Sequence, residues 1–145
     1  MIMPILTVND VDASVAFFTD KLGFRHDMSM AGPQGGNIFA IVGLGAAVLG
    51  LGIDDGVPKN TPFAPGVQFM VYLPEEQDID SYYADVKAKG VKIDDELADT
   101  YWGDRAFSIH DPNGYLLTFA VTIAQLPMEQ IEANYQQQER KMPEG

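Results

Sequence analysis

The side chains that could do chemistry gather in the last third of the chain. Trp102 is the only tryptophan, Arg105 follows it by three positions, and His110 closes the same apolar segment. An indole can stack on a flat molecule and a guanidinium can pair with a carboxylate, so this segment could form part of a small-molecule site. Structural alternatives stay open: a packed rim indole, an arginine that holds Asp104 or Asp111, and a surface histidine.

Other kinds of catalysis find little support. The chain has no cysteine, which excludes a thiolate nucleophile, a thiolate metal site and a disulfide framework. It contains no Gly-x-Ser-x-Gly segment, and Gly35-Gly36 does not stand between a strand and a helix as a phosphate loop would. No catalytic residue can be assigned from these patterns.

Composition predicts a single domain over residues 1–145, of which 46% are hydrophobic. The formal net charge of −12 repels phosphate backbones and anionic lipid surfaces, so neither nucleic acid nor a membrane is an expected partner. The longest apolar stretch, over 38–53, is interrupted by glycines and is too short to span a bilayer. Residues 1–4 lack a basic leader, so we expect a cytoplasmic location.

One pattern occurs twice along the chain. An apolar strand pattern leads into Phe17-Phe18 and then Gly23, and a second one leads into Tyr82-Tyr83 and then Gly90. The aromatic pairs stand 82 − 17 = 65 residues apart, which indicates one supersecondary unit used twice. We therefore expect an α+β fold of two β-α-β-β-β units.

Turn and capping residues set the expected boundaries. Asp12 is the expected N-cap of the first helix, over about 13–22, and the sixth strand is expected over about 91–97. The first half should cover about 3–53, the connector 54–66, the second half about 67–122, and a terminal helix about 127–141. That terminal helix, with a moderately apolar stripe, could lie on its own domain or exchange contacts with a second subunit.

Two segments carry a family resemblance. They are residues 8–24, around Phe17-Phe18-Thr19-Asp20-Lys21-Leu22-Gly23-Phe24, and the hairpin from Trp102 through Asp111-Pro112-Asn113-Gly114 to Phe119. Over about residues 3–122 the chain resembles the vicinal-oxygen-chelate superfamily, which includes glyoxalase I, bleomycin-resistance proteins and extradiol dioxygenases. The resemblance implies cup-shaped mixed sheets with the helices outside. It also implies a ligand on the concave face, often at a subunit junction, so we expect a homodimer.

Metal-dependent members of that superfamily hold a divalent ion with His, Gln or Glu on the first and last strands of each half. The resemblance carries these positions onto Met3, Gln68 and Thr118, with Asp54 just beyond the end of the fourth strand. A methionine and a threonine cannot replace imidazole or carboxylate ligands. We therefore expect no metal and no cofactor, which places the chain closest to the bleomycin-resistance-like branch.

Strand alternation predicts which side chains line the cup. Gln68, Met70 and Tyr72 should face it from the fifth strand, and Ser108 should face it from the seventh. The expected ligand-binding residues are Thr7, Gln68, Met70, Tyr72, Trp102, Arg105, His110 and Thr118.

Three functions remain open at this stage. The favoured one is a binding protein for a small, partly aromatic molecule, and the acidity of the chain suits a cationic ligand. The second is a divergent lyase, isomerase or dioxygenase-like enzyme. The third is a regulatory or assembly module with a vestigial pocket.

Overall fold

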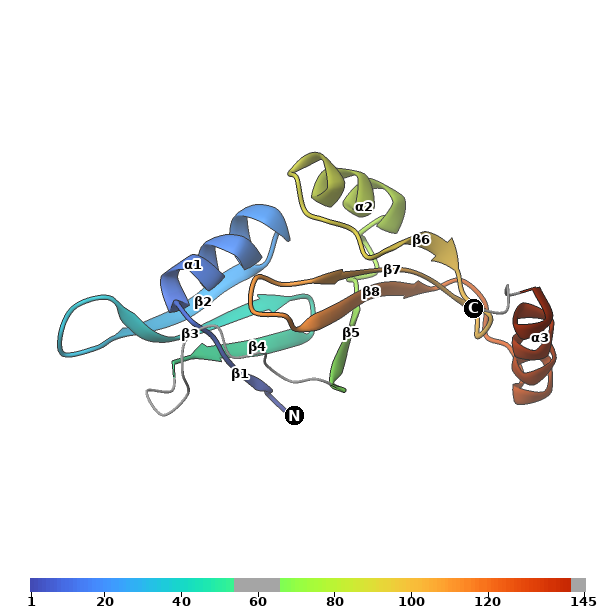
Figure 1. Ribbon diagram of the computed structural model, residues 1–145, viewed down its shortest axis with the longest axis horizontal. Coiled ribbons are helices and arrows are strands. Elements are labelled where there is room, and N and C mark those ends of the chain that lie inside the picture. Colours follow the sequence, from blue (N-terminus) through green and yellow to red (C-terminus); the bar gives the residue numbers. More distant parts are fainter. Residues whose placement is uncertain (54–65, 142–145) are drawn as a thin grey trace.

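Two mixed four-stranded sheets with the same topology lie next to each other (Figure 1). The computed structural model describes residues 1–53 and 66–141. The first half contains β1 (Ile5–Thr7), α1 (Val11–Ala16), the π-helical turn η1 (Phe17–Lys21), β2 (Arg25–Ala31), β3 (Asn37–Leu44) and β4 (Ala47–Gly52). The second contains β5 (Gln68–Tyr72), α2 (Ile79–Ala88), β6 (Asp95–Asp99), β7 (Asp104–His110) and β8 (Leu116–Thr122), and α3 (Met128–Lys141) follows it.

Strand order confirms the duplicated α+β unit. The sheets run β1-β4-β3-β2 and β5-β8-β7-β6, and in each the first strand pairs in parallel with the last while the remaining pairs are antiparallel. A parallel pair needs a crossover connection, and the helix of each unit lies on that connection. Helices α1 and α2 lie on the same side of the two sheets (Figure 1).

The first helix begins earlier than expected, because its N-cap is Asp10 and not Asp12. Asp10 has an extended backbone, and its carboxylate accepts a hydrogen bond from the Ala13 amide at 3.0 Å. The Asp12 carboxylate instead accepts from the Asn37 side chain at 2.7 Å, which ties the helix to the start of β3.

The sixth strand also differs from the expectation of about 91–97. Val91 and Ile93 pack against the hydrophobic core before any strand pairing begins, and β6 then pairs with β7 from Asp95 through an irregular register. Val91 and Ile93 therefore show the apolar alternation that is typical of a strand because they pack on the core, although they do not pair in the sheet. The predicted connector, residues 54–66, lies outside the described residues except for Gly66.

The closed face of the second sheet supports an aromatic core. Phe107 and Phe119 lie opposite each other on β7 and β8, and their rings stack at 5.3 Å beneath Tyr82 of α2. Phe119 also contacts Phe24 of the first half at 6.4 Å between ring centroids. The two halves therefore share one continuous core.

Polar contacts of the last hairpin join the halves as well. The Asn113 side-chain oxygen accepts from the Asn9 amide at 3.1 Å, and its nitrogen donates to the Ser14 hydroxyl at 3.2 Å and to Asp111 at 3.1 Å. Asn113 is buried, so its side-chain oxygen and nitrogen are satisfied by these protein partners and not by water.

Helix α3 lies at the far end of the second sheet and is largely exposed (Figure 1). Its bounds agree closely with the predicted terminal helix, and Asn134 donates to the carbonyl of Tyr101 in the same chain at 3.1 Å. Among the described residues, none of the helices combines the length and apolar composition that crossing a bilayer requires.

Replacing the buried amide at the junction should destabilise the fold. Asn113→Ala removes the acceptor for the Asn9 amide and a donor to Ser14, and we expect it to lower the free energy of unfolding by about 1–3 kcal/mol in urea denaturation. Ser14→Ala should cost less, because the Asn113 nitrogen still donates to Asp111. Equal stability of Asn113→Ala and the wild type would show that the halves do not depend on this amide.

Candidate functional site

The open face of the second sheet carries the candidate site. Because side chains alternate along a strand, burial of Phe107 and Phe119 under α2 places Ser108 and Thr118 on the opposite face. Gln68 of β5 faces the same way, paired with Leu116 at the start of β8. This arrangement follows the predicted alternation.

A chain of neutral hydrogen bonds crosses this face. The Gln68 amide nitrogen donates to the Thr118 hydroxyl at 2.7 Å, and the hydroxyls of Thr118 and Ser108 lie 2.7 Å apart. Thr118 and Ser108 are both buried. Hydrogen bonding between these side chains thus satisfies polar groups that would otherwise need water or a ligand.

This donor set does not fit a divalent metal. Gln68 and Thr118 occupy two of the positions that the family resemblance assigned to metal ligands, and they offer an amide and a hydroxyl already engaged with each other. Transition-metal sites need several imidazole, carboxylate or thiolate ligands that converge. Within residues 1–53 and 66–141, no three His, Asp or Glu side chains gather closely enough to hold an ion. Asp54, the remaining candidate, lies outside the described residues.

A buried carboxylate holds two aromatic side chains at the rim. Asp104, only 3% exposed, accepts from the Trp102 indole nitrogen and from the Tyr72 hydroxyl, each at 2.7 Å. The hydrogen bond to the Asp104 carboxylate, together with burial and its charge, raises the pKa of Tyr72 above its usual value. The phenol therefore stays neutral at physiological pH, and it links β5 to the first residue of β7.

Trp102 opens onto a cavity of about 270 Å³. Gln68, Ser108 and Thr118 form part of its lining, and Asp95 and Ala98 line it from β6. This volume lies just below the range of roughly 300–1,000 Å³ that is typical of small-molecule pockets. The remaining lining residues are Glu96, Asp99, Thr100, Tyr101, Ala106, Phe107 and Gln138.

Every charged side chain that lines this cavity is acidic. The lining includes Asp95, Glu96 and Asp99, with no Lys, Arg or His among the described lining residues. Lys87 pairs with Glu96 at 3.4 Å and Arg105 pairs with Asp99 at 2.9 Å, and neither cation lines the cavity. The indole of Trp102 beside the carboxylate of Asp95 suits a molecule that is flat and positively charged.

Arg105 lies on the helix-covered face and does not join the cavity. Its guanidinium pairs with Asp80 of α2 at 2.8 Å and with Asp99, and these hydrogen bonds hold the pKa of Arg105 above its usual value. This placement favours a structural role for Arg105 over the expected ligand contact, although its partners are Asp80 and Asp99 and not the expected Asp104 or Asp111. The arginine anchors α2 to β6.

The other predicted residues are spread over the open faces. Met70 and Tyr72 are exposed on β5 beside the cavity but do not line it, and His110 pairs with Asp94 at 2.6 Å. Thr7 lies in the first sheet, where its carbonyl accepts from the Tyr115 hydroxyl at 2.8 Å. Of the predicted set, the cavity brings together Gln68, Trp102 and Thr118.

Sequence reasoning missed Asp104, Asp95 and Gln138 as site residues. Asp104 could have been noticed from its position two residues after the only tryptophan. Nothing local marks Gln138, because it reaches the cavity from α3 through tertiary packing alone.

Comparisons with known proteins agree with this fold. Residues 2–119 match the family model described as Glyoxalase/Bleomycin resistance protein/Dioxygenase superfamily. TioX from Micromonospora sp. ML1 is similar in structure, with a TM-score of 0.67 and 24% identity over 83% of this chain and 97% of that one. No curated protein matches the chain.

Two further solved structures have different printed roles. TnmS3, an antibiotic binding protein from Streptomyces sp. CB03234, has a TM-score of 0.60 and 22% identity over 83% of this chain and 93% of that one. A lactoylglutathione lyase from Agrobacterium tumefaciens has a TM-score of 0.62 and 19% identity over 83% and 92%. At these identities each likeness establishes the fold alone.

Asp104→Asn should bring the pKa of Tyr72 back toward 10.0, because the negative neighbour that disfavours the phenolate is gone. Near-ultraviolet absorbance titration would measure this, with Tyr72→Phe in each background to isolate the signal of Tyr72. Because the folded pKa is raised, the stability from this contact is complete below about pH 10 and is lost as pH rises through the folded pKa.

Asp99→Asn is the matched control for that titration. Asp99 also lines the cavity but pairs with Arg105, so the Tyr72 pKa should stay unchanged. An unchanged Tyr72 pKa in Asp104→Asn would show that the Asp104 carboxylate does not raise the pKa of the phenol.

Proposed function

Since the chain belongs to the glyoxalase/bleomycin resistance protein/dioxygenase superfamily, we propose that it is a binding protein for a small, partly aromatic molecule. The ligand occupies the open face of the second sheet, and no metal ion takes part. The observation that carries this proposal is the pairing of Gln68 with Thr118 beside an indole that opens onto the cavity.

The neutral hydrogen-bond chain favours binding over metal-assisted catalysis. A lyase or dioxygenase of this superfamily would polarise its substrate with a metal, but Gln68, Ser108 and Thr118 provide no anionic ligand. What they provide is a row of amide and hydroxyl groups at the floor of a small cavity. A neutral floor of this kind can hold a bound molecule without changing it.

The rim supports an aromatic and cationic ligand. Trp102 is 36% exposed, and its ring orientation is fixed by Asp104, so a flat molecule meets a surface that is already in place. Asp95 of β6 lines the same cavity and would attract a positive charge, whereas Glu96 and Asp99 are paired with Lys87 and Arg105. The antibiotic binding named for TnmS3 is consistent with a small-molecule ligand.

A homodimer forms part of the proposal. The open face of the first sheet is apolar, with Ile5 61%, Met28 41% and Met30 50% exposed. Phe39 and Ile41 lie on that same face, since they pair with Met30 and Met28. An apolar sheet face of this kind is typical of a protein contact, and in the proposed homodimer a second copy of the chain covers it.

The purified protein should bind a planar cation and hold no stoichiometric metal. Elemental analysis should find far less than one Zn, Ni, Mn or Fe per chain. Titration with bleomycin, ethidium or a neutral anthraquinone should change the emission of Trp102 saturably for at least one of them, with the two cations favoured over the neutral quinone. One metal per chain, removable by a chelator with loss of an activity, would instead support the lyase or dioxygenase alternative.

Trp102→Ala tests the site itself by calorimetry with whichever probe binds. Loss of stacking should weaken binding roughly tenfold, equivalent to about 1.4 kcal/mol. Tyr101→Ala is not a suitable control because Tyr101 touches the indole, whereas exposed Lys92→Ala should leave affinity unchanged. If Trp102→Ala instead unfolds the protein, and the fraction that stays folded keeps its affinity, Trp102 stabilises the core and does not contact the ligand.

Met30→Glu should dissociate the homodimer. A charge on the exposed apolar face cannot be buried against a partner without a large desolvation cost, so light scattering at micromolar concentration should find monomer. Met128→Glu, at a position that is 65% exposed on α3, should remain a dimer. A wild-type protein that is monomeric at that concentration would contradict this part of the proposal.

A further inference from the structure

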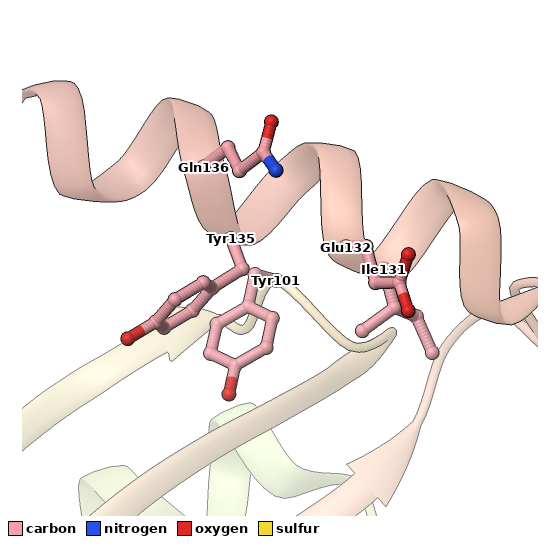
Figure 2. A pocket seen from close by; sticks show the side chains of 5 residues that line it. All are labelled: Tyr101, Ile131, Glu132, Tyr135 and Gln136. Carbon is pink, nitrogen blue, oxygen red and sulfur yellow. The ribbon is translucent and has the colours of Figure 1, made fainter.

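The terminal helix packs on the residue that precedes the only tryptophan. The rings of Tyr135 and Tyr101 lie edge to face at 5.1 Å, and the Asn134 side chain donates to the Tyr101 carbonyl. Figure 2 shows both tyrosine rings below the helix, with Ile131 farther along it. Between the helix and this turn is a cavity of about 300 Å³ lined by Tyr101, Ile131, Glu132, Tyr135 and Gln136.

Tyr101 in turn contacts Trp102. Their rings lie edge to face at 4.9 Å, with an interplanar angle of 81°. Tyr101 lines the cavity under α3 and also the cavity of the candidate site. A continuous aromatic contact therefore runs from Tyr135 through Tyr101 to the indole that opens onto the site.

A second connection is made by the backbone. The carbonyl of Gly103 accepts from the amides of Ile123 and Ala124 at 2.9 and 3.0 Å, so the segment that leads to α3 is tied to the Trp102 turn. Gly103 has a φ of +103°, and a side chain there would collide with the Ala124 carbonyl. This close approach requires glycine at position 103.

The helix also contributes a side chain to the site directly. Gln138, three residues after Tyr135 and on an adjacent part of the helix surface, lines the same cavity as Trp102, Gln68 and Thr118. The family model ends at residue 119, and α3 starts at Met128, so this wall lies outside the segment that defines the family.

We propose that α3 is a wall of the ligand site: it positions Trp102 through Tyr101 and places Gln138 at the cavity. This inference rests on the proposed function for its ligand, but the wall itself exists without one. It assigns Tyr135 and Tyr101 as positioning residues and Gln138 as a specificity-determining residue for whatever the cavity holds.

Acrylamide quenching of Trp102 tests the wall without any ligand. In the full chain, Tyr135→Ala should raise the quenching constant of the indole about twofold, because the ring that holds Tyr101 in place against Trp102 is lost. Gln138→Ala should raise it by a smaller amount, since one side chain leaves the cavity. Gln137→Ala, on the same helix but outside both cavities, should match the wild type.

Tyr135→Phe separates positioning from a general loss of helix. It keeps the ring that contacts Tyr101 and should restore wild-type quenching, while circular dichroism verifies the helix content of every variant. Unchanged quenching in both Tyr135→Ala and Gln138→Ala would overturn the proposal. So would an equal rise in Gln137→Ala, which would indicate fraying of the whole helix.

Ethidium titration distinguishes this inference from the proposed function. If ethidium binds the wild type, Gln138→Ala should weaken it severalfold and Gln137→Ala should not, and equal affinities would overturn the assigned role of Gln138. If ethidium, bleomycin and anthraquinone all fail to bind, the proposed function fails, and the quenching series still decides whether α3 positions Trp102.

Discussion

The stacked pair of Phe107 and Phe119 is the contact on which the rest of the structure depends. Their cross-strand pairing sets the register of β7 on β8, and their burial beneath α2 decides which face of the second sheet is closed. Phe119 also reaches Phe24, so the same cluster holds the two halves together. A shift of one residue in that register would turn the side chains of the shifted strand, Ser108 or Thr118 among them, to the other face. The hydroxyls of Ser108 and Thr118 meet on the open face because the two rings meet on the closed one.

The open face combines a neutral floor with an acidic rim, and this division carries the functional argument. At the floor, Gln68, Thr118 and Ser108 are bonded to one another. None of these three side chains carries the charge that a metal site or an acid-base mechanism would need. At the rim, the carboxylates of Asp95 and Asp104 lie beside the indole of Trp102. Binding a flat cation uses both features. Asp104 connects them, since one buried carboxylate holds the indole of Trp102 and the phenol of Tyr72 in place.

Helix α3 adds to the duplicated fold without being part of it. The two β-α-β-β-β units are complete at Thr122, and the helix returns to the Trp102 turn through the backbone contacts of Gly103. Because most of α3 is exposed, its position depends on few contacts, chiefly those of Tyr135 and Asn134 with Tyr101. An element held by so few contacts can vary in sequence at little cost to the core, which makes it a suitable place for ligand specificity.

The sequence by itself determined the two units, their strand and helix types, and the faces of β5, β7 and β8, because hydrophobic periodicity and turn chemistry are local properties. Gln68, Thr118 and Trp102 could be placed in one cavity on those grounds. Local patterns failed at Asp12, where the neighbouring Asp10 caps the helix, and at Val91 and Ile93, where core packing imitates a strand. Only the tertiary structure decided that Arg105 faces α2, that Asp104 binds two aromatic side chains, and that Gln138 reaches the site. These outcomes depend on distances between segments far apart in the chain, which sequence spacing does not encode.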